Sequence, residues 1–154
     1  MRRLAELLDP APRGFYTEEI REAGERRGFR LVGFDGSTAV IAHVDFPKTH
    51  RVSKYGVDVE AIDQASAKTL APRRSHGVCV VDEIGKMECL SERFITGIRR
   101  LLDSERTVVA SIAQRGSGFI AEVKRREDCE LWSLTRANRD AMPARMLEWI
   151  RERK

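Results

Sequence analysis

The stretch Gly77-Val-Cys-Val-Val-Asp-Glu83 decides the fold class of this 154-residue chain. Its four apolar residues, 78–81, stand in a row without polar alternation, which is typical of a parallel strand covered on both faces. Asp82 and Glu83 end the run. Ligands in α/β proteins bind beyond the carboxyl ends of parallel strands, so these two acids are the first candidates for a functional site.

Helix and strand patterns alternate on both sides of this run. Upstream, they predict a helix with Leu4, Leu7 and Leu8 on one face, a strand over 14–17, a hairpin over 28–34 and 38–44, and a helix from Asp58 to Leu70 ended by Pro72. Downstream, they predict a helix capped by Ser91, a buried strand over 107–112, a helix over 117–126, a short strand over 131–134, and a final helix lined by Met142, Met146, Trp149 and Ile150. This alternation predicts the α/β class, with a mainly parallel sheet, an inserted β-hairpin and a single domain over residues 1–154.

Composition excludes several classes of protein. The longest apolar runs are a handful of residues, far short of the roughly 20 that a membrane span requires, and the start of the chain has no signal-peptide core. Three cysteines without a CxxC pair fit neither a disulfide framework nor a zinc site, so we expect a cytoplasmic protein. The net charge is +4, but the basic residues are scattered among acids, which predicts a solvated surface without a nucleic-acid groove. We also expect a monomer.

The two acids after the buried run suit the chemistry of magnesium. A carboxylate at the tip of a rigid strand, here Asp82, can hold Mg²⁺ directly or through its water shell, together with phosphate oxygens. Glu83 could orient or deprotonate a water molecule that attacks a phosphate in line. The pair resembles a Walker B element. Taken alone, the pattern is weak evidence for a magnesium site, because strands often end in acids that cap the next helix.

Five blocks of sequence, in one order, are more specific than this pair. They are Gly14-Phe-Tyr-Thr-Glu-Glu-Ile-Arg21, Gly28-Phe29, Tyr55-Gly-Val-Asp-Val-Glu60, Asp82-Glu-Ile-Gly-Lys-Met-Glu88 and Thr135-Arg-Ala-Asn-Arg-Asp140. Together they closely resemble the THEP-type nucleoside triphosphatases over almost all of the chain. The resemblance implies a three-layer P-loop fold of the ATPase branch. It also implies Mg²⁺-dependent hydrolysis of nucleoside triphosphates to diphosphate and phosphate, with broad base specificity.

The resemblance also implies roles for individual residues. Asp82 would hold Mg²⁺, and Glu83, with help from Lys86, would carry the catalysis. The residues that would contact the nucleotide are Thr17, Glu18, Asn138 and Arg139. Other interpretations stay open: Lys86 could pair with Glu88, Thr17 and Glu18 could belong to a charged turn, and Asn138 could cap a helix. Ser111, at the end of the strand over 107–112, could sense the γ-phosphate or cap a helix.

One part of the family pattern is missing from the sequence. No G-x-x-x-x-G-K-S/T phosphate loop occurs in it, so the first strand and the Walker A loop are expected to be absent. Hydrolysis by the chain as written should then be poor. Either Met1 is a misplaced start and the sequence is truncated, or the chain is a non-catalytic pseudo-NTPase that serves as an interaction module. In-frame codons upstream of Met1 would distinguish these two. A nucleotide or small-molecule kinase is a further alternative, because the same scaffold supports both reactions.

Overall fold

The computed structural model describes residues 1–71 and 77–153. Its strands in the described ranges form one sheet in the order β4-β5-β3-β2-β1-β6-β7. They are β1 (Arg13–Glu22), β2 (Glu25–Gly33), β3 (Thr38–His43), β4 (Arg51–Val52), β5 (Tyr55–Val57), β6 (Cys79–Ile84) and β7 (Val108–Ile112). The helices in the described ranges are α1 (Arg2–Leu7), α2 (Val59–Thr69), α3 (Glu92–Leu102), α4 (Phe119–Lys124) and α5 (Met142–Arg151), and a 3₁₀ turn, η1, spans Glu88–Leu90.

The apolar run before Asp82 forms an inner parallel strand, as predicted. β6 pairs in parallel with β1 on one side and with β7 on the other. Cys79 and Val81 pack into the larger core cluster, whereas Val78 and Val80 pack into a smaller cluster. Successive side chains of a strand point to opposite faces, so β6 is buried on both sides of the sheet.

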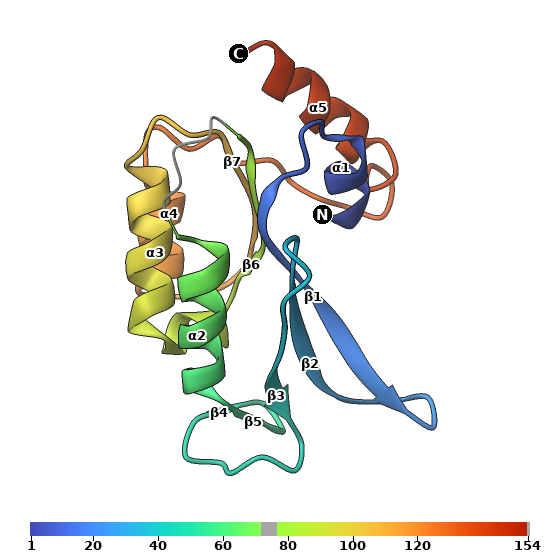
Figure 1. Ribbon diagram of the computed structural model, residues 1–154, viewed down its shortest axis with the longest axis vertical. Helices are drawn as coiled ribbons and strands as arrows, with labels where there is room; N and C mark the ends of the chain where they lie inside the picture. Colours follow the sequence, from blue (N-terminus) through green and yellow to red (C-terminus); the bar gives the residue numbers. More distant parts are fainter. Residues whose placement is uncertain (72–76, 154) are drawn as a thin grey trace.

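The prediction of a mainly parallel sheet is wrong, because the sheet is mixed. β1 pairs with β2, β2 with β3, β3 with β5 and β4 with β5, all antiparallel. The predicted hairpin exists, but it continues the main sheet through β1 instead of standing apart as an insertion. β1 is also longer than the predicted strand over 14–17, and with β2 it projects as a ribbon beyond the body of the protein (Figure 1).

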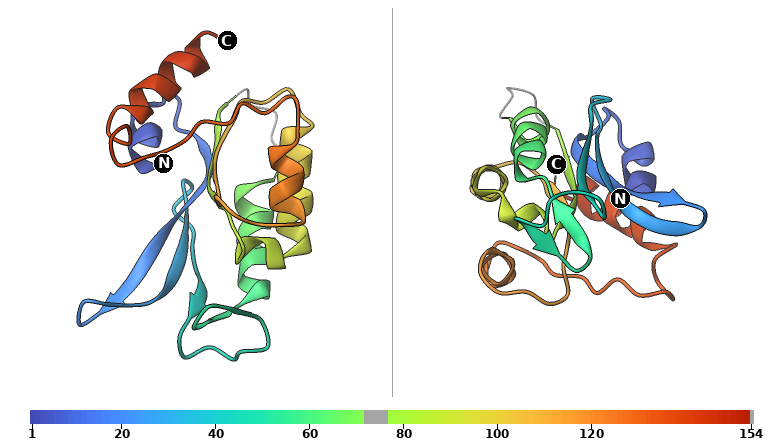
Figure 2. Two further views of the ribbon diagram at one scale, coloured as in Figure 1. Left: turned by 180° about the vertical axis from the view of Figure 1, so that it is seen from behind. Right: turned by 90° about the horizontal axis from the view of Figure 1, so that it is seen from below.

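Helices cover the two faces of the sheet, which confirms the α/β class and the three layers. α2, α3 and α4 lie on one face, and α1 and α5 lie together on the other (Figures 1 and 2). The predicted caps of α2 and α3 are confirmed. The Asp58 carboxylate accepts a hydrogen bond from the Ala61 N–H, and the Ser91 hydroxyl accepts one from the Phe94 N–H, each at 2.9 Å. Pro72, predicted to end α2, lies outside the described residues.

Two predictions on the later part of the chain need correction. Residues 131–134 form no strand: they run as a loop in which Leu131 and Leu134 are 55% and 64% exposed. The strand over 107–112, predicted to be buried, forms β7 (Val108–Ile112) at the end of the order of the described strands, and of its residues only Val109 is buried. No helix in the described ranges is long and apolar enough to cross a membrane. The three cysteines are all free, as the absence of a paired spacing predicted.

Candidate active site

The carboxyl end of β6 is irregular where its two acids stand. The ladder between β6 and β7 shifts register between Val81 and Ile84, so that Asp82 and Glu83 stand opposite the single β7 residue Ser111. Two residues against one is the pattern of a β-bulge, which turns side chains out of the regular pleat and is frequent beside active sites. The bulge therefore gives the two acids different orientations at the same edge of the sheet.

Asp82 is held from the neighbouring strand. Its carboxylate is half-buried, and the Ser111 hydroxyl donates a hydrogen bond to Asp82 Oδ1. Parallel strands end at the same edge of a sheet, which is why polar residues near the carboxyl ends of β6 and β7 meet here. The contact places Ser111 beside the candidate metal ligand, and the hydroxyl caps no helix.

Glu83 and Glu88 converge on the turn that follows. A Cβ atom at Gly85 would lie 2.4 Å from Glu83 Oε1 and 2.8 Å from Glu88 Oε2, so the two carboxyl groups flank this glycine. Partial burial raises the pKa of Glu83, and the negative charge of Asp82 raises it further. An acid with a raised pKa is a stronger base once it is ionised.

Glu88 is the buried member of this acid cluster. Its side chain is only 4% exposed, and burial raises its pKa from 4.5 to about 7. Hydrogen bonds from the backbone N–H groups of Glu88 and Gly85 oppose this rise, and the charges of Glu83 and Asp82 add to it. The sequence offered a pair between Glu88 and Lys86 as one interpretation, but no local signal predicted that this carboxyl group would be buried.

The donors at this edge fit a magnesium ion that is shared with a ligand. The described residues contain no group of three or more His, Cys, Asp or Glu side chains that could enclose a metal. Mg²⁺ does not require such a cage, because it is commonly held by one or two carboxylates, water and substrate phosphates. Asp82, whose carboxylate accepts a hydrogen bond from Ser111, could supply one such ligand.

Thr17 and Glu18 lie on β1, the other neighbour of β6. The two strands pair up to Phe15 and Val81 and then separate. Beyond that point β1 pairs with β2, where Thr17 stands opposite Leu31. Glu18 forms an ion pair of 3.5 Å with Arg2 of α1. Both residues therefore follow directly after the segment that pairs with β6, but β1 carries them away from its acidic end.

Lys86 lies in the turn between β6 and α3. Its side chain is exposed, and in the part of the chain that the structure describes it makes no ion pair with Glu88. The alternative interpretation of a Lys86–Glu88 pair is therefore wrong. The ammonium group remains close in sequence to Asp82 and accessible to an anion.

Asn138 and Arg139 lie in the turn before α5. Asn138 closes this turn, since its Oδ1 accepts from the Thr135 N–H and its Nδ2 donates to the Ser133 carbonyl, each at 2.8 Å. Its side chain does not cap α5, whose N-cap is Ala141. Arg139 is exposed, with its Nε 3.8 Å from a carboxylate oxygen of Asp140. α5 packs beside α1, away from the acidic end of β6 (Figure 1), so the structure does not bring these two residues to Asp82.

Comparison with known proteins identifies the family. A family model described as NTPase matches residues 2–147 of the chain. The chain belongs to this NTPase family. A relative in the NTPase family, the nucleoside-triphosphatase THEP1 of Thermotoga petrophila, is 38% identical over 143 residues, which cover 92% of this chain and 79% of the relative. The human cancer-related nucleoside-triphosphatase is 31% identical over 141 residues, covering 82% and 74% of the two chains.

Solved structures from the NTPase family have the same fold. The crystal structure of THEP1 from Aquifex aeolicus matches with a TM-score of 0.86 and 30% identity, over 96% of this chain and 88% of that one. The solution structure of the human cancer-related nucleoside triphosphatase matches with a TM-score of 0.83 and 28% identity, over 99% and 90%. The resemblance drawn from the five sequence blocks is thus confirmed, and the mixed sheet belongs to a P-loop NTPase family.

Proposed function

We propose that this chain hydrolyses nucleoside triphosphates to diphosphate and phosphate, in a Mg²⁺-dependent reaction with broad base specificity. One observation carries the proposal: Asp82 and Glu83 stand in a bulge at the carboxyl end of an inner parallel strand, with Ser111 donating to Asp82. Membership of the NTPase family and the names of the relatives support this choice of reaction.

At this edge Asp82 and Ser111 would serve the metal ion, and Glu83 would serve the attacking water. Asp82 would hold Mg²⁺ through its carboxylate, and Ser111 would keep that carboxylate in one orientation by donating its hydroxyl proton. The ion, when bound, neutralises charge that develops on the phosphate oxygens. Glu83, whose pKa is raised by burial and by Asp82, would accept a proton from the attacking water and hold that water in line.

The remaining candidates have weaker support. Lys86 has an accessible ammonium group in the same turn and would offset phosphate charge. Thr17 and Glu18 would contact the nucleotide from β1. Asn138 and Arg139 would bind a part of the nucleotide away from the metal, with the planar guanidinium suited to a base or a phosphate.

Turnover by these 154 residues should be slow. The sequence contains no G-x-x-x-x-G-K-S/T motif. Such a loop supplies backbone N–H groups that cradle the phosphates, a lysine for the β and γ oxygens, and a hydroxyl ligand for Mg²⁺. Without these groups, electrostatic stabilisation of the transition state would depend on the acids of β6 and the ion that they would hold. The same observation favours the second candidate function, a non-catalytic interaction module.

Phosphate release under single-turnover conditions tests the proposal. The chain in excess over ATP, GTP, CTP or UTP should release phosphate slowly with Mg²⁺ and not with EDTA. Glu83→Gln should lower the rate on the order of a hundredfold, because it removes the base. It should leave binding of a fluorescent triphosphate unchanged.

The matched control is Glu127→Gln, which neutralises an exposed acid in the turn after α4 and should release phosphate like the unaltered chain. If no nucleotide yields phosphate above the EDTA background, these 154 residues do not carry out the proposed hydrolysis. If Glu83→Gln hydrolyses at the unaltered rate, Glu83 does not position the water.

A further inference from the structure

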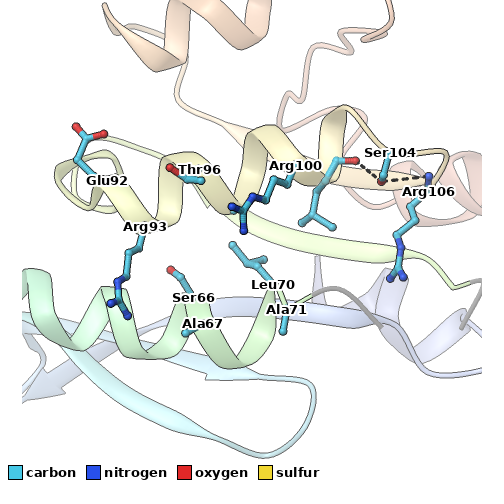
Figure 3. A pocket seen from close by; sticks show the side chains of 12 residues that line it. Ser66, Ala67, Leu70, Ala71, Glu92, Arg93, Thr96, Arg100, Ser104 and Arg106 are labelled. Carbon is cyan, nitrogen blue, oxygen red and sulfur yellow. Dashed lines mark hydrogen bonds between the residues drawn. The ribbon is translucent and has the colours of Figure 1, made fainter. Parts of the chain in front are cut away.

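A groove between α2 and α3 has the size and lining of a small-molecule site. Its volume is about 540 Å³, within the range of typical ligand pockets. Leu70 and Leu101 form apolar walls, and the small residues Ala67, Ala71 and Gly97 complete the lining. Figure 3 shows Leu70, Ala67 and Ala71 on the α2 side of the groove.

Three arginines without carboxylate partners surround this apolar groove. Arg93 and Arg100 come from α3, and Arg106 comes from the segment before β7. In the described ranges none of the three makes an ion pair, whereas Arg99, the neighbour of Arg100, is paired with Glu122. A lining acid, Glu92, points away from the three guanidinium groups (Figure 3). The groove therefore presents unneutralised positive charge.

A buried hydroxyl without a partner also lines the groove. Ser66 of α2 is 3% exposed, and its Oγ has no hydrogen-bond partner among the described residues. It points from α2 toward α3 (Figure 3). Buried polar side chains are nearly always hydrogen-bonded, so an unpaired hydroxyl at this depth is unusual. Ser66 thus has a donor available for an acceptor that enters the groove.

The groove is separate from the candidate active site. Thr107, next to Arg106, accepts a hydrogen bond through its carbonyl from the Cys79 N–H, which places the Arg106 end beside the beginning of β6. Asp82 and Glu83 stand at the opposite end of the same strand. The groove lining includes none of Asp82, Glu83 and Ser111, so a ligand at its Arg106 end would leave the position of the metal and of the attacking water free.

We propose that this groove binds a small amphipathic anion, with an apolar body and one carboxylate or phosphate head group. The leucine walls would cover the body. A guanidinium group matches the two oxygens of either head group, and a charge-assisted hydrogen bond of this kind is stronger than a neutral one. The Ser66 hydroxyl would donate to the same head group and so gain the partner that it lacks.

The dye anilinonaphthalene sulfonate is a suitable probe, because it joins an aromatic body to one anionic group and fluoresces in apolar sites. The unaltered chain should bind it saturably at one site. Arg100→Gln removes a guanidinium and should weaken binding about tenfold, because roughly one charge-assisted contact is lost. Thr96→Phe fills the groove from an exposed position of α3 and should also weaken binding about tenfold, because access to the site is lost. Arg136→Gln removes an exposed charge from the loop before α5 and should bind like the unaltered chain.

Ser66→Ala separates ligand binding from a purely structural role. Loss of the unpaired hydroxyl should raise the melting temperature of the free chain and weaken dye binding at the same time, whereas a structural hydroxyl would lower the melting temperature. Hexyl phosphate and hexanoate, used as competitors, then distinguish the two head groups, and displacement by either supports the proposal. Binding that does not saturate, an unchanged affinity in Arg100→Gln, Thr96→Phe or Ser66→Ala, or failure of both competitors overturns it.

Discussion

Replacement of Glu88 by glutamine tests the electrostatics of the acid cluster. The carboxyl group is 4% exposed, and its pKa in the folded protein is about 7, raised from 4.5 by burial and then by the charges of Glu83 and Asp82. The folded chain therefore binds this proton more tightly than the unfolded chain does. Such a group stabilises the fold fully below its unfolded pKa, and the contribution is lost as the pH rises through the folded pKa.

The size of the effect follows from the two pKa values. A rise from 4.5 to about 7 corresponds to about 3 kcal/mol of stability lost between acidic and alkaline pH. Glutamine has the shape of the protonated acid and cannot ionise. We therefore expect Glu88→Gln to exceed the unaltered chain in free energy of unfolding by about 3 kcal/mol at pH 8 and by only about 1 kcal/mol at pH 5.

Urea unfolding at several pH values between 5 and 8, with EDTA present to exclude metal ions, measures both free energies by linear extrapolation. The control is Glu105→Gln, an exposed acid before β7, which should leave the pH dependence unchanged. Equal stability of Glu88→Gln and the unaltered chain at pH 8 would show that the folded protein does not hold Glu88 as a buried acid, and the reasoning would be refuted.

Three further substitutions test the backbone, a cap and the metal site. Gly14→Ala should destabilise the chain by about 3 kcal/mol or more in thermal unfolding, because φ is +98° and a Cβ would lie 2.0 Å from the Val80 carbonyl oxygen; a smaller loss would contradict this packing. Ser91→Ala removes the acceptor of the Phe94 N–H and should cost about 1–2 kcal/mol in urea unfolding, with an unchanged midpoint as the contrary result. Ser111→Ala should raise the Mg²⁺ concentration for half-maximal phosphate release about tenfold, and an identical Mg²⁺ dependence would separate this hydroxyl from the metal.

Local signals in the sequence predicted most helices and the inner strand correctly. Asp58 and Ser91 each cap the helix that they were expected to cap, because an N-cap depends on a side chain and a backbone N–H three residues apart. The apolar run before Asp82 predicted burial on both faces, because a strand that is covered on both sides has apolar residues at successive positions. Each signal lies within a few residues of the feature that it reports.

Strand pairing could not be predicted in the same way, because the partner of a strand is distant in sequence. The second half of β1 is polar and has little to bury, and pairing with β2 holds it as a strand. Glu19 forms ion pairs across and along this ribbon with Arg26 and Arg21, each at 2.6 Å. An alternating pattern shows which face of a strand is apolar but not which strand lies beside it, so the parallel character of the sheet was overestimated.

The candidate site was likewise predictable only where the signal in the sequence is local. Asp82, Glu83 and Ser111 were expected near one sheet edge, because adjacent parallel strands end together, and the Ser111 hydrogen bond to Asp82 fits that expectation. The burial of Glu88 depends on how the turn after β6 folds back, with its carboxyl group placed beside that of Glu83. The position of Arg139 depends on where α5 packs. Neither has a local signal in the sequence.

Residues 131–134 show why an apolar pattern alone does not make a strand. The run at β6 has a hydrogen-bonding strand on each side, so its backbone groups are satisfied where its side chains are buried. No strand of the described sheet pairs with residues 131–134. Trp132 instead packs against Trp149 of α5, with ring centroids 6.3 Å apart, and donates its indole N–H to Glu130. Unpaired backbone groups must then remain in contact with water, which keeps Leu131 and Leu134 at the surface despite their apolar side chains.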